Sequence, residues 1–275
     1  MKQVHVRLVD TGFCRHPEAA TMEAASWRPV PFPALVGVIR HPEEGIVLFD
    51  TGYDPLFLSA TDPFPERLYR WLTPPTIKDP IADRLVREGV SPESVNHIVL
   101  SHFHGDHASG LRRFPSARIH CAKAGMRGVW DQGRLRSLAA GTPAALLPPD
   151  LPARCVFFED GSPIPLPADL APFIEGVDLL GDGSMLAVPL PGHCPGHWGL
   201  VIDEPRGLHF LVADAAWSSR AIRENRPPPR LTSALLGNTA QGRHTLGRLH
   251  RLRLRNPDLL MTPSHCRERA SALSQ

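Results

Sequence analysis

One short segment, Ser101-His-Phe-His-Gly-Asp-His107, constrains this chain more than any other, because it places four potential metal ligands within six positions. It directly follows the apolar run His97-Ile-Val-Leu-Ser101, which the pattern predicts to be a buried strand. Side chains at a strand end and in the following loop can converge on one small volume. Imidazole and carboxylate groups are ligands for zinc and related cations. So tight a turn cannot give all four to one ion, so the segment predicts two adjacent ions. The alternative is a solvated histidine-rich loop. The four ligands are His102, His104, Asp106 and His107.

Length and charge exclude several classes of protein. The chain has 275 residues, enough for a sizeable core and within the range of one domain, so a single domain over residues 1–275 is expected. A formal net charge of +2 indicates no nucleic-acid partner. Five scattered cysteines do not form a disulfide framework. The chain has no membrane-length apolar stretch, and its start resembles a strand rather than a signal peptide, so a cytoplasmic location is expected.

One local cluster of charge lies in residues 243–255, where five arginines alternate with Leu246, Leu249 and Leu252. The leucines recur at near-helical spacing, which predicts a surface helix with a solvated basic face. A nucleic-acid patch is the less favoured alternative. One of the arginines could also bind an anionic tail of a substrate.

Apolar runs bounded by turn residues predict strands, with helices between them. The clearest helix is Ile81–Glu88, with Asp79 expected to cap it and Gly89 just past its end. Others are expected from Ala122, from Trp217 to Glu224, and from Thr239 to just before Pro257. The predicted strands are Val4–Val9, Ala34–Arg40, Gly45–Phe49, His97–Ser101, Arg118–Cys121, Cys155–Phe158, Met185–Pro189, Gly199–Ile202, His209–Ala213 and Leu259–Thr262.

This order predicts an α/β fold of two sheets packed face to face with helices outside. Two proline-rich insertions, residues 61–80 and 139–172, interrupt the pattern. Long insertions usually lie on the surface and often shape an active site. These two are expected to cover the substrate, to be plain surface excursions, or to form a homodimer contact.

Three later segments also end an apolar run in a ligand-type residue, namely His193, Asp214 and His265. Ligands held at strand ends are placed more accurately than ligands on free loops. Together with the first segment they form two sets of donors with Asp214 shared, because a carboxylate can give one oxygen to each ion. The first set is His102, His104 and His193, and the second is Asp106, His107 and His265. Such nitrogen and oxygen donors suit zinc, with iron, manganese or cobalt as alternatives.

These residues resemble the metallo-β-lactamase-fold hydrolases. The resemblance rests on Phe49-Asp50-Thr51-Gly52, the segment 101–107, Pro191-Gly-His-Cys-Pro-Gly-His197, Asp214 and His265, and it extends from about residue 34 to residue 266. It implies an αββα sandwich of two mixed β-sheets with outer helices and a dinuclear metal site at one rim. Within the family, the motif spacing is most similar to the N-acyl-homoserine lactonases. Glyoxalase II thioesterases have similar ligands, but their helical glutathione-binding region has no counterpart that we find here.

Several further residues receive expected roles. Asp106 is expected to be both a ligand and the catalytic proton carrier, while Asp50 either orients a ligand or forms a structural turn. His197 is expected to lie behind the ligands or to serve packing. The lactonases that the chain resembles have a Tyr three residues after the bridging Asp, and Trp217 stands there instead. Tyr53 is expected as a substitute near the rim.

Cys194 and Cys266 each follow a ligand His, and both are expected to be buried small residues that point away from the metals. Thiolate ligation is the less favoured alternative.

The expected function is metal-dependent hydrolysis of a lactone or ester by a metal-bridging hydroxide, with a small acyl compound as substrate. Alternatives on the same fold are a thioesterase, a phosphodiesterase, a mononuclear-iron sulfur oxidoreductase, or a ligand-binding protein without turnover.

Overall fold

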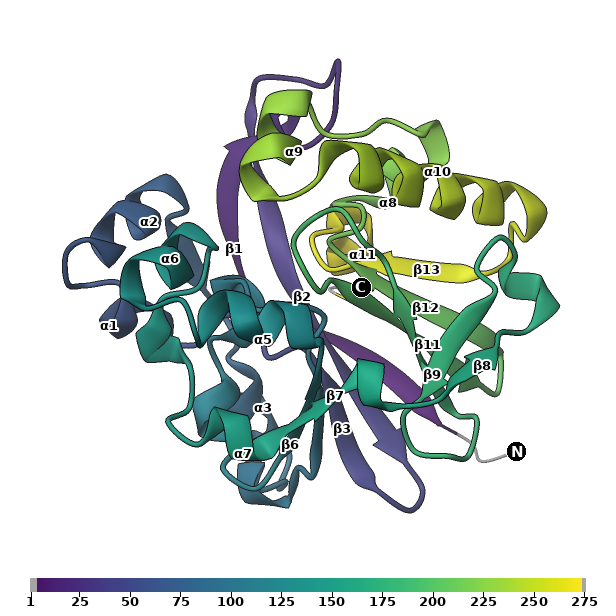
Figure 1. Ribbon diagram of the computed structural model, residues 1–275, viewed down its shortest axis with the longest axis horizontal. Coiled ribbons are helices and arrows are strands. Elements are labelled where there is room, and N and C mark those ends of the chain that lie inside the picture. The colour runs from purple at the N-terminus through teal and green to yellow at the C-terminus, as the bar shows by residue number, and fades with distance from the viewer. Residues whose placement is uncertain (1–3, 274–275) are drawn as a thin grey trace.

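The computed structural model describes residues 4–273, and its strands form two mixed sheets that pack face to face (Figure 1). The first sheet has the order β4 (Pro75–Ile77), β1 (His5–Pro17), β2 (Pro29–His41), β3 (Gly45–Phe49), β5 (His97–Val99), β6 (Arg118–Cys121) and β7 (Cys155–Phe157). The second has the order β13 (Leu260–Pro263), β12 (Gly207–Ala213), β11 (Trp198–Glu204), β10 (Met185–Pro189), β9 (Glu175–Asp178) and β8 (Pro163–Pro165). The predicted αββα sandwich is confirmed.

Helices cover the outer face of each sheet, as Figure 1 shows. On the side of the first sheet lie α1 (Leu56–Ala60), α2 (Glu66–Leu72), α3 (Ile81–Arg87), α4 (Gly105–Ala108), α5 (Lys123–Val129), α6 (Arg134–Ala139) and α7 (Leu151–Arg154). On the side of the second lie α8 (Ser219–Glu224), α9 (Arg230–Leu236) and α10 (Thr239–Arg255), whereas α11 (Arg267–Ala272) contacts β2 of the first sheet. Within residues 4–273, no helix combines the length and the apolar character needed to cross a membrane.

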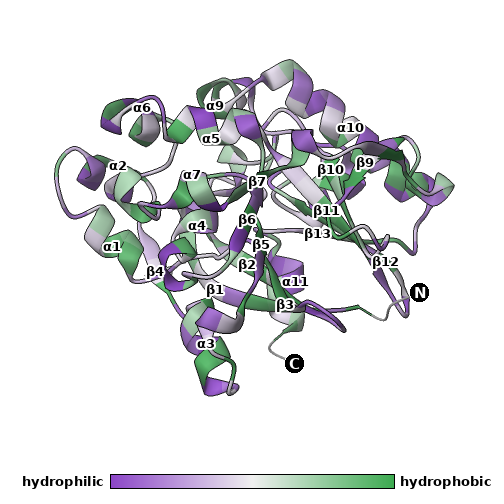
Figure 2. Cartoon of the chain, turned by 60° about the horizontal axis from the view of Figure 1, so that its bottom comes forward, coloured by the Kyte–Doolittle hydropathy of each residue, from purple (hydrophilic) through white to green (hydrophobic). Residues whose placement is uncertain are grey.

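Three apolar layers hold the sandwich together, and strand periodicity assigns residues to them. On β3, Ile46 and Leu48 face outward with the helical side chains, whereas Val47 and Phe49 face the second sheet. On β10, Leu186 and Val188 likewise face outward, and Met185 and Ala187 face the first sheet. The outer layer of the second sheet includes Leu246, Leu249 and Leu252 of α10. The strands of this sheet are largely hydrophobic in Figure 2, whereas hydrophilic residues mark α10. The helix predicted over the arginine cluster is therefore confirmed.

The β1–β2 pair is longer than the sequence predicts, and its extension matters for the site. The pairing continues past a register shift between Asp10 and Phe13 and ends at Pro17 opposite Pro29. The extension of β2 contains prolines at positions 29, 31 and 33, and proline cannot donate a hydrogen bond to a neighbouring strand. The prolines occupy alternate positions, so the backbone N–H groups that they lack would all lie along the same edge of β2. Leu35, in the same phase, donates its backbone N–H away from β1 to the Ser264 carbonyl at 3.0 Å. Prolines in this phase therefore cost no hydrogen bond to β1.

Other local predictions fail for identifiable reasons. Asp79 does not cap α3, because its carboxylate pairs with Arg84 and Arg87 and Pro80 occupies the N-cap without a side-chain hydrogen bond. The short strands β4 and β8 both contain proline, and β9 lies in a segment without apolar alternation, so the pattern gave no signal for them. The boundaries predicted for β3, β6 and β10 agree with the structure.

Candidate metal centre

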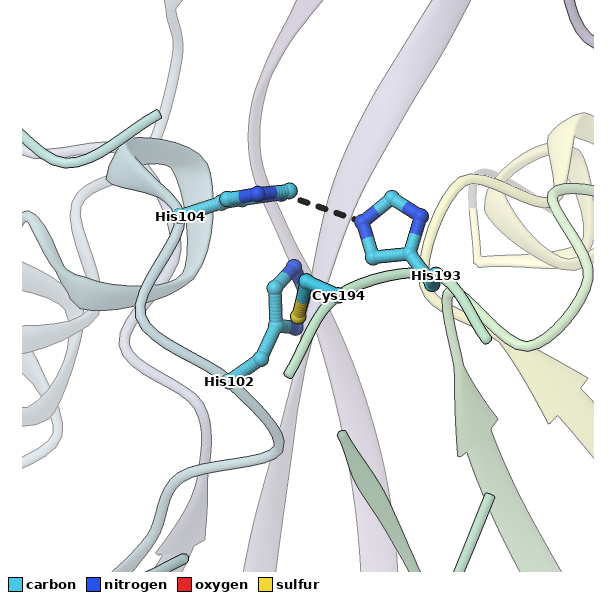
Figure 3. A group of neighbouring side chains, drawn as sticks. All are labelled: His102, His104, His193 and Cys194. Carbon is cyan, nitrogen blue, oxygen red and sulfur yellow. Dashed lines mark hydrogen bonds between the residues drawn. The ribbon is translucent and has the colours of Figure 1, made fainter. Parts of the chain in front are cut away.

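The seven predicted ligand residues meet at one rim of the sandwich, because each follows the end of a strand. The segment after β5 carries His102 and His104 and leads into α4, which carries Asp106 and His107. His193 lies in the turn between β10 and β11, and Asp214 and His265 directly follow β12 and the end of β13. Figure 3 shows His102, His104 and His193 turned toward one another. The donor atoms form three groups, each within 4.8 Å: His102, His104, His193 and Cys194; His102, His107 and Asp214; Asp106, His107 and His265.

Asp214 lies between the two predicted sets of ligands. Its Oδ2 is 3.4 Å from His193 Nε2 and 3.1 Å from His265 Nε2, and its Oδ1 is 3.4 Å from His107 Nε2. On the other side of the first set, His104 Nδ1 is 3.0 Å from His193 Nε2. One carboxylate therefore reaches imidazoles of both sets, as a bridging ligand must.

Three buried polar atoms in the cluster of ligands have no hydrogen-bond partner, which bears on whether the site suits a cation. His102 Nε2, His107 Nε2 and Asp214 Oδ1 are buried and make no hydrogen bond within the described residues. Leaving such groups unpaired costs free energy, so native structures rarely tolerate it. A cation accepts electron pairs from all three atoms at once. The donor set, imidazole and carboxylate, fits divalent zinc or a similar ion.

Hydrogen bonds behind the histidines fix which nitrogen faces the site. His107 Nδ1 donates to Asp50 Oδ2 at 2.8 Å, and His265 Nδ1 donates to the Pro33 carbonyl at 2.6 Å. Both bonds leave Nε2 free to bind a cation. Ser101 Oγ donates to Asp50 Oδ2 at 2.9 Å and lies 3.0 Å from His102 Nδ1. Asp50 thus orients one imidazole directly and another through Ser101, a residue that sequence reasoning missed.

Backbone strain occurs next to two of these carboxylates. Asp50 has a φ of +63° and Ala213, which precedes Asp214, has a φ of +45°. Non-glycine residues rarely adopt this left-handed region, and they keep it where the surroundings enforce it, often at functional sites. Both turns aim a carboxylate at the cluster instead of continuing the strand.

Burial and neighbouring charges shift the pKa values of several ligand residues. It lowers the pKa of His102 and His193 well below the ordinary imidazole value, so both are neutral near pH 7. Burial acts in the opposite direction on Asp214, but the imidazoles of His265, His107 and His193 outweigh it and keep the pKa of that carboxyl well below its usual range. Neutral imidazole and ionised carboxylate are the forms that bind cations.

Two of the predicted neighbours support Asp214. His197 Nδ1 donates to the Leu190 carbonyl at 3.0 Å, and its Nε2 accepts the backbone N–H of Asp214 at 3.1 Å. Both of its nitrogens are used, so His197 holds the end of β12 in place. Trp217 Nε1 donates to Asp214 Oδ2 at 2.9 Å, which fixes the orientation of the carboxylate between the two sets.

The role expected for Tyr53 stays a prediction, because this residue is buried and is not among those that line the metal cavity. The Tyr53 ring packs edge-on against Phe57 with centroids 5.3 Å apart. Tyr69 of α2 lines the metal cavity instead. The Tyr69 ring lies against Gly105, the residue between the ligands His104 and Asp106 in the sequence. The sequence offered no signal for this, because the position of Tyr69 depends on how α2 packs within the proline-rich insertion.

Five of the seven ligand residues, namely His104, Asp106, His193, Asp214 and His265, line a cavity of about 240 Å³. Its walls are mostly apolar and include Phe32, Trp217 and Leu236. The extended β1–β2 pair supplies Phe32, and the two proline-rich insertions supply Tyr69 and Gly141. A Cβ atom at Gly141 would lie 2.7 Å from Cδ2 of His104, so only glycine fits there without displacing a ligand.

Comparison with known proteins identifies the family. The family model of the metallo-beta-lactamase superfamily matches residues 29–235. The chain therefore belongs to the metallo-beta-lactamase superfamily, and family and site together define it as a metallo-hydrolase.

Two relatives and one solved structure show how similar this chain is to individual proteins. The chain is 30% identical over 230 residues to a probable metallo-hydrolase of Mycobacterium tuberculosis, covering 81% of this chain and 71% of the relative. It is 30% identical over 148 residues to an N-acyl homoserine lactonase of Azorhizobium caulinodans, about half of each chain (54% and 51%). The structure of an N-acyl homoserine lactone hydrolase with N-hexanoyl-L-homoserine at its catalytic metal centre superposes with a TM-score of 0.74. That likeness covers 99% of this chain and 96% of the other at 18% identity, so it supports the fold alone.

Proposed function

We propose that this protein is a dinuclear metal-dependent hydrolase that opens lactones or cleaves esters of small acyl compounds, with N-acyl-homoserine lactones as the first candidates. One observation carries the proposal: seven ligand side chains, three with unpartnered buried atoms, cluster together, and five of them line a mostly apolar cavity. The similarity to an N-acyl homoserine lactonase supports this choice of substrate.

The proposed centre has two positions. His102, His104 and His193 would hold one divalent ion and Asp106, His107 and His265 would hold the other, with Asp214 within reach of both sets. Two bound cations, zinc or else iron, manganese or cobalt, supply Lewis acidity that lowers the pKa of a water and polarises an acyl carbonyl.

The chain itself supplies orientation and proton transfer. Asp106 lines the cavity and has Oδ2 3.4 Å from His265 Nε2. It takes up the proton released when water adds to the carbonyl carbon, and it returns that proton to the alkoxide oxygen when the carbon–oxygen bond breaks. Trp217 and Asp50 hold Asp214 and His107 in their orientations. The apolar walls accept the acyl chain and exclude water from it.

A hydrolysis panel on metal-loaded protein tests the proposal. It should contain homoserine lactones of several acyl lengths, simple esters, thioesters and phosphodiesters, with His104→Ala as the control that removes one ligand. We expect the lactones to be hydrolysed fastest and the variant to be inactive while still folded. Thioesters or phosphodiesters turned over far faster would replace the proposed substrate class. A fully metal-loaded protein without turnover on the whole panel would instead indicate a ligand-binding role.

A further inference from the structure

Cys194 does not point away from the metal centre, contrary to the sequence-based expectation. That expectation assumed strand alternation, but residues 191–197 form consecutive turns between β10 and β11. The turns bring the Cys194 sulfur into the first donor group, within 4.8 Å of the ligand nitrogens of His102, His104 and His193. Figure 3 shows the Cys194 side chain beside the His102 ring.

The surroundings of Cys194 differ from those of the other thiols in residues 4–273. Cys266 contacts the hydroxyl of Ser219 at 3.1 Å, the sulfurs of Cys121 and Cys155 lie 3.6 Å apart, and Cys14 bonds to Tyr53. Cys194 faces imidazole nitrogens instead. Among these three histidines, His102 has its Nε2 buried without a hydrogen-bond partner. A sulfur in the same donor group as a histidine with an unpaired nitrogen points to a shared ligand.

We propose that Cys194 is a fourth, sulfur ligand for the ion held by His102, His104 and His193. This inference rests on the proposed metal centre and makes its two positions chemically different. Three imidazoles and one thiolate give four donors before the share of Asp214 is counted, and four is the number that zinc takes in tetrahedral sites. On binding, the S–H bond breaks, the proton passes to solvent, and the sulfur electron pair forms the bond to the cation.

The two positions should therefore select different metals. Thiolate is a soft ligand and favours zinc over manganese or magnesium, whereas the second set has only nitrogen and oxygen donors and accepts harder ions. The second set also has fewer protein donors, because it comprises only Asp106, His107 and His265 with a share of Asp214. Water and substrate are accordingly expected to enter at this second position.

Cobalt(II) substitution of the purified full-length protein tests the sulfur bond directly. A thiolate bound to cobalt gives an intense near-ultraviolet charge-transfer band that imidazole and carboxylate do not. We expect this band in the wild-type protein and its loss in Cys194→Ser. Cys14→Ser should keep the band, because Cys14 lines the same cavity but lies outside the donor group. Since losing even an outer partner of a ligand costs 10- to 100-fold in metal affinity, losing Cys194 should weaken the tighter zinc site by roughly 100-fold.

The outcomes separate this inference from the proposed function. The wild-type spectrum needs no variant to fold: two bound cobalt ions per chain without a sulfur band would refute the Cys194 ligand, even if lactones were hydrolysed. A band that persists in Cys194→Ser would refute it as well. Conversely, a band that depends on Cys194 in a protein that hydrolyses nothing would support the ligand and overturn the function.

Discussion

Asp50 orients two metal ligands, His107 directly and His102 through Ser101, and single substitutions can separate these two effects. Its Oδ2 accepts from His107 Nδ1 and from Ser101 Oγ, which in turn contacts His102, while its Oδ1 accepts from the Ser101 backbone N–H. In Asp50→Asn one of the two accepting oxygens becomes an NH2 group, which cannot accept a hydrogen bond, so we expect metal affinity to fall about 10- to 100-fold. Ser101→Ala disturbs only the contact to His102 and should cost less. Competition with a chromogenic chelator measures both, and equal affinities for the two variants would contradict this arrangement.

His120 on β6 is buried and should make the protein sensitive to acid. Its Nε2 lies 2.9 Å from His97 Nδ1. Burial, and then His97, lowers the pKa of His120 to about 4 from 6.5. The unfolded chain takes up the proton first as the pH falls, so the stability contributed by neutral His120 is complete above pH 6.5 and is lost toward pH 4.

Between pH 7 and pH 5, wild type should lose on the order of 2 kcal/mol more unfolding free energy than His120→Gln. Urea denaturation of the chelator-treated proteins measures this difference. His244→Gln, at an exposed position of α10, is the matched control and should follow wild type. Parallel losses in wild type and His120→Gln would show that burial does not suppress protonation of His120.

For single residues, the sequence predicts the site residues that follow strand ends, but it does not predict those whose position depends on how other parts of the chain pack. The convergence of His193, Asp214 and His265 followed from one repeated rule, an apolar run that ends in a ligand-type side chain. Ser101 and Tyr69 follow no such rule. The first acts through its contact with Asp50, and the second depends on the packing of a short helix, so neither had a local signature.

At the scale of elements, α2 brings a phenol into the cavity that the sequence placed elsewhere. Burial, and then the Asp106 carboxylate, raises the pKa of Tyr69, so its hydroxyl stays protonated and can donate to a carbonyl oxygen. If lactones are substrates, Tyr69→Phe should lower kcat roughly 10- to 100-fold with a smaller change in KM. Steady-state kinetics checks this, with Tyr53→Phe as the buried comparison. A loss seen only in Tyr53→Phe would reverse the assignment.

The helix α9 has one leucine that lines the cavity and another that faces solvent, so substitutions can distinguish a contact with substrate from a general effect on the helix. Leu236 and Thr232 line the cavity, whereas Leu231 and Leu235 on the same helix are 74% and 75% exposed. Leu236→Ala removes apolar wall, so kcat/KM for long acyl chains should fall roughly 5- to 50-fold while short chains change less. Leu235→Ala is the matched control and should leave both unchanged. Equal losses for short and long chains would place the acyl group elsewhere.

The elements also show why prediction succeeds in the centre of the sheets and fails at the rim. Buried strands such as β3 and β10 carry continuous apolar residues, so their boundaries could be read directly. The outer half of the β1–β2 pair contains alternate prolines and polar residues. Its strand character depends on pairing geometry that residue type alone does not reveal, and this half contributes Phe32 to the cavity wall.

At the scale of the whole molecule, the proposed metal centre joins the two sheets. His102 and the ligands of α4 follow strand β5 of the first sheet, while His193, Asp214 and His265 follow strands of the second. Ions bound there stabilise the folded state by mass action, about 4 kcal/mol when free metal exceeds Kd a thousandfold. For a chain of this size that corresponds to a rise in Tm on the order of 10 °C.

Thermal unfolding of chelator-treated and zinc-reloaded protein measures this difference. His104→Ala should reduce it, because the variant keeps the second set of ligands but loses one donor of the first. The comparison also tests whether the metal centre depends on both sheets. Because its donors come from both sheets, a protein with separated sheets could not hold the ions. The rise in Tm must therefore appear as one cooperative transition. A metal-loaded protein with unchanged Tm would mean that the seven side chains do not bind ions across the sheets.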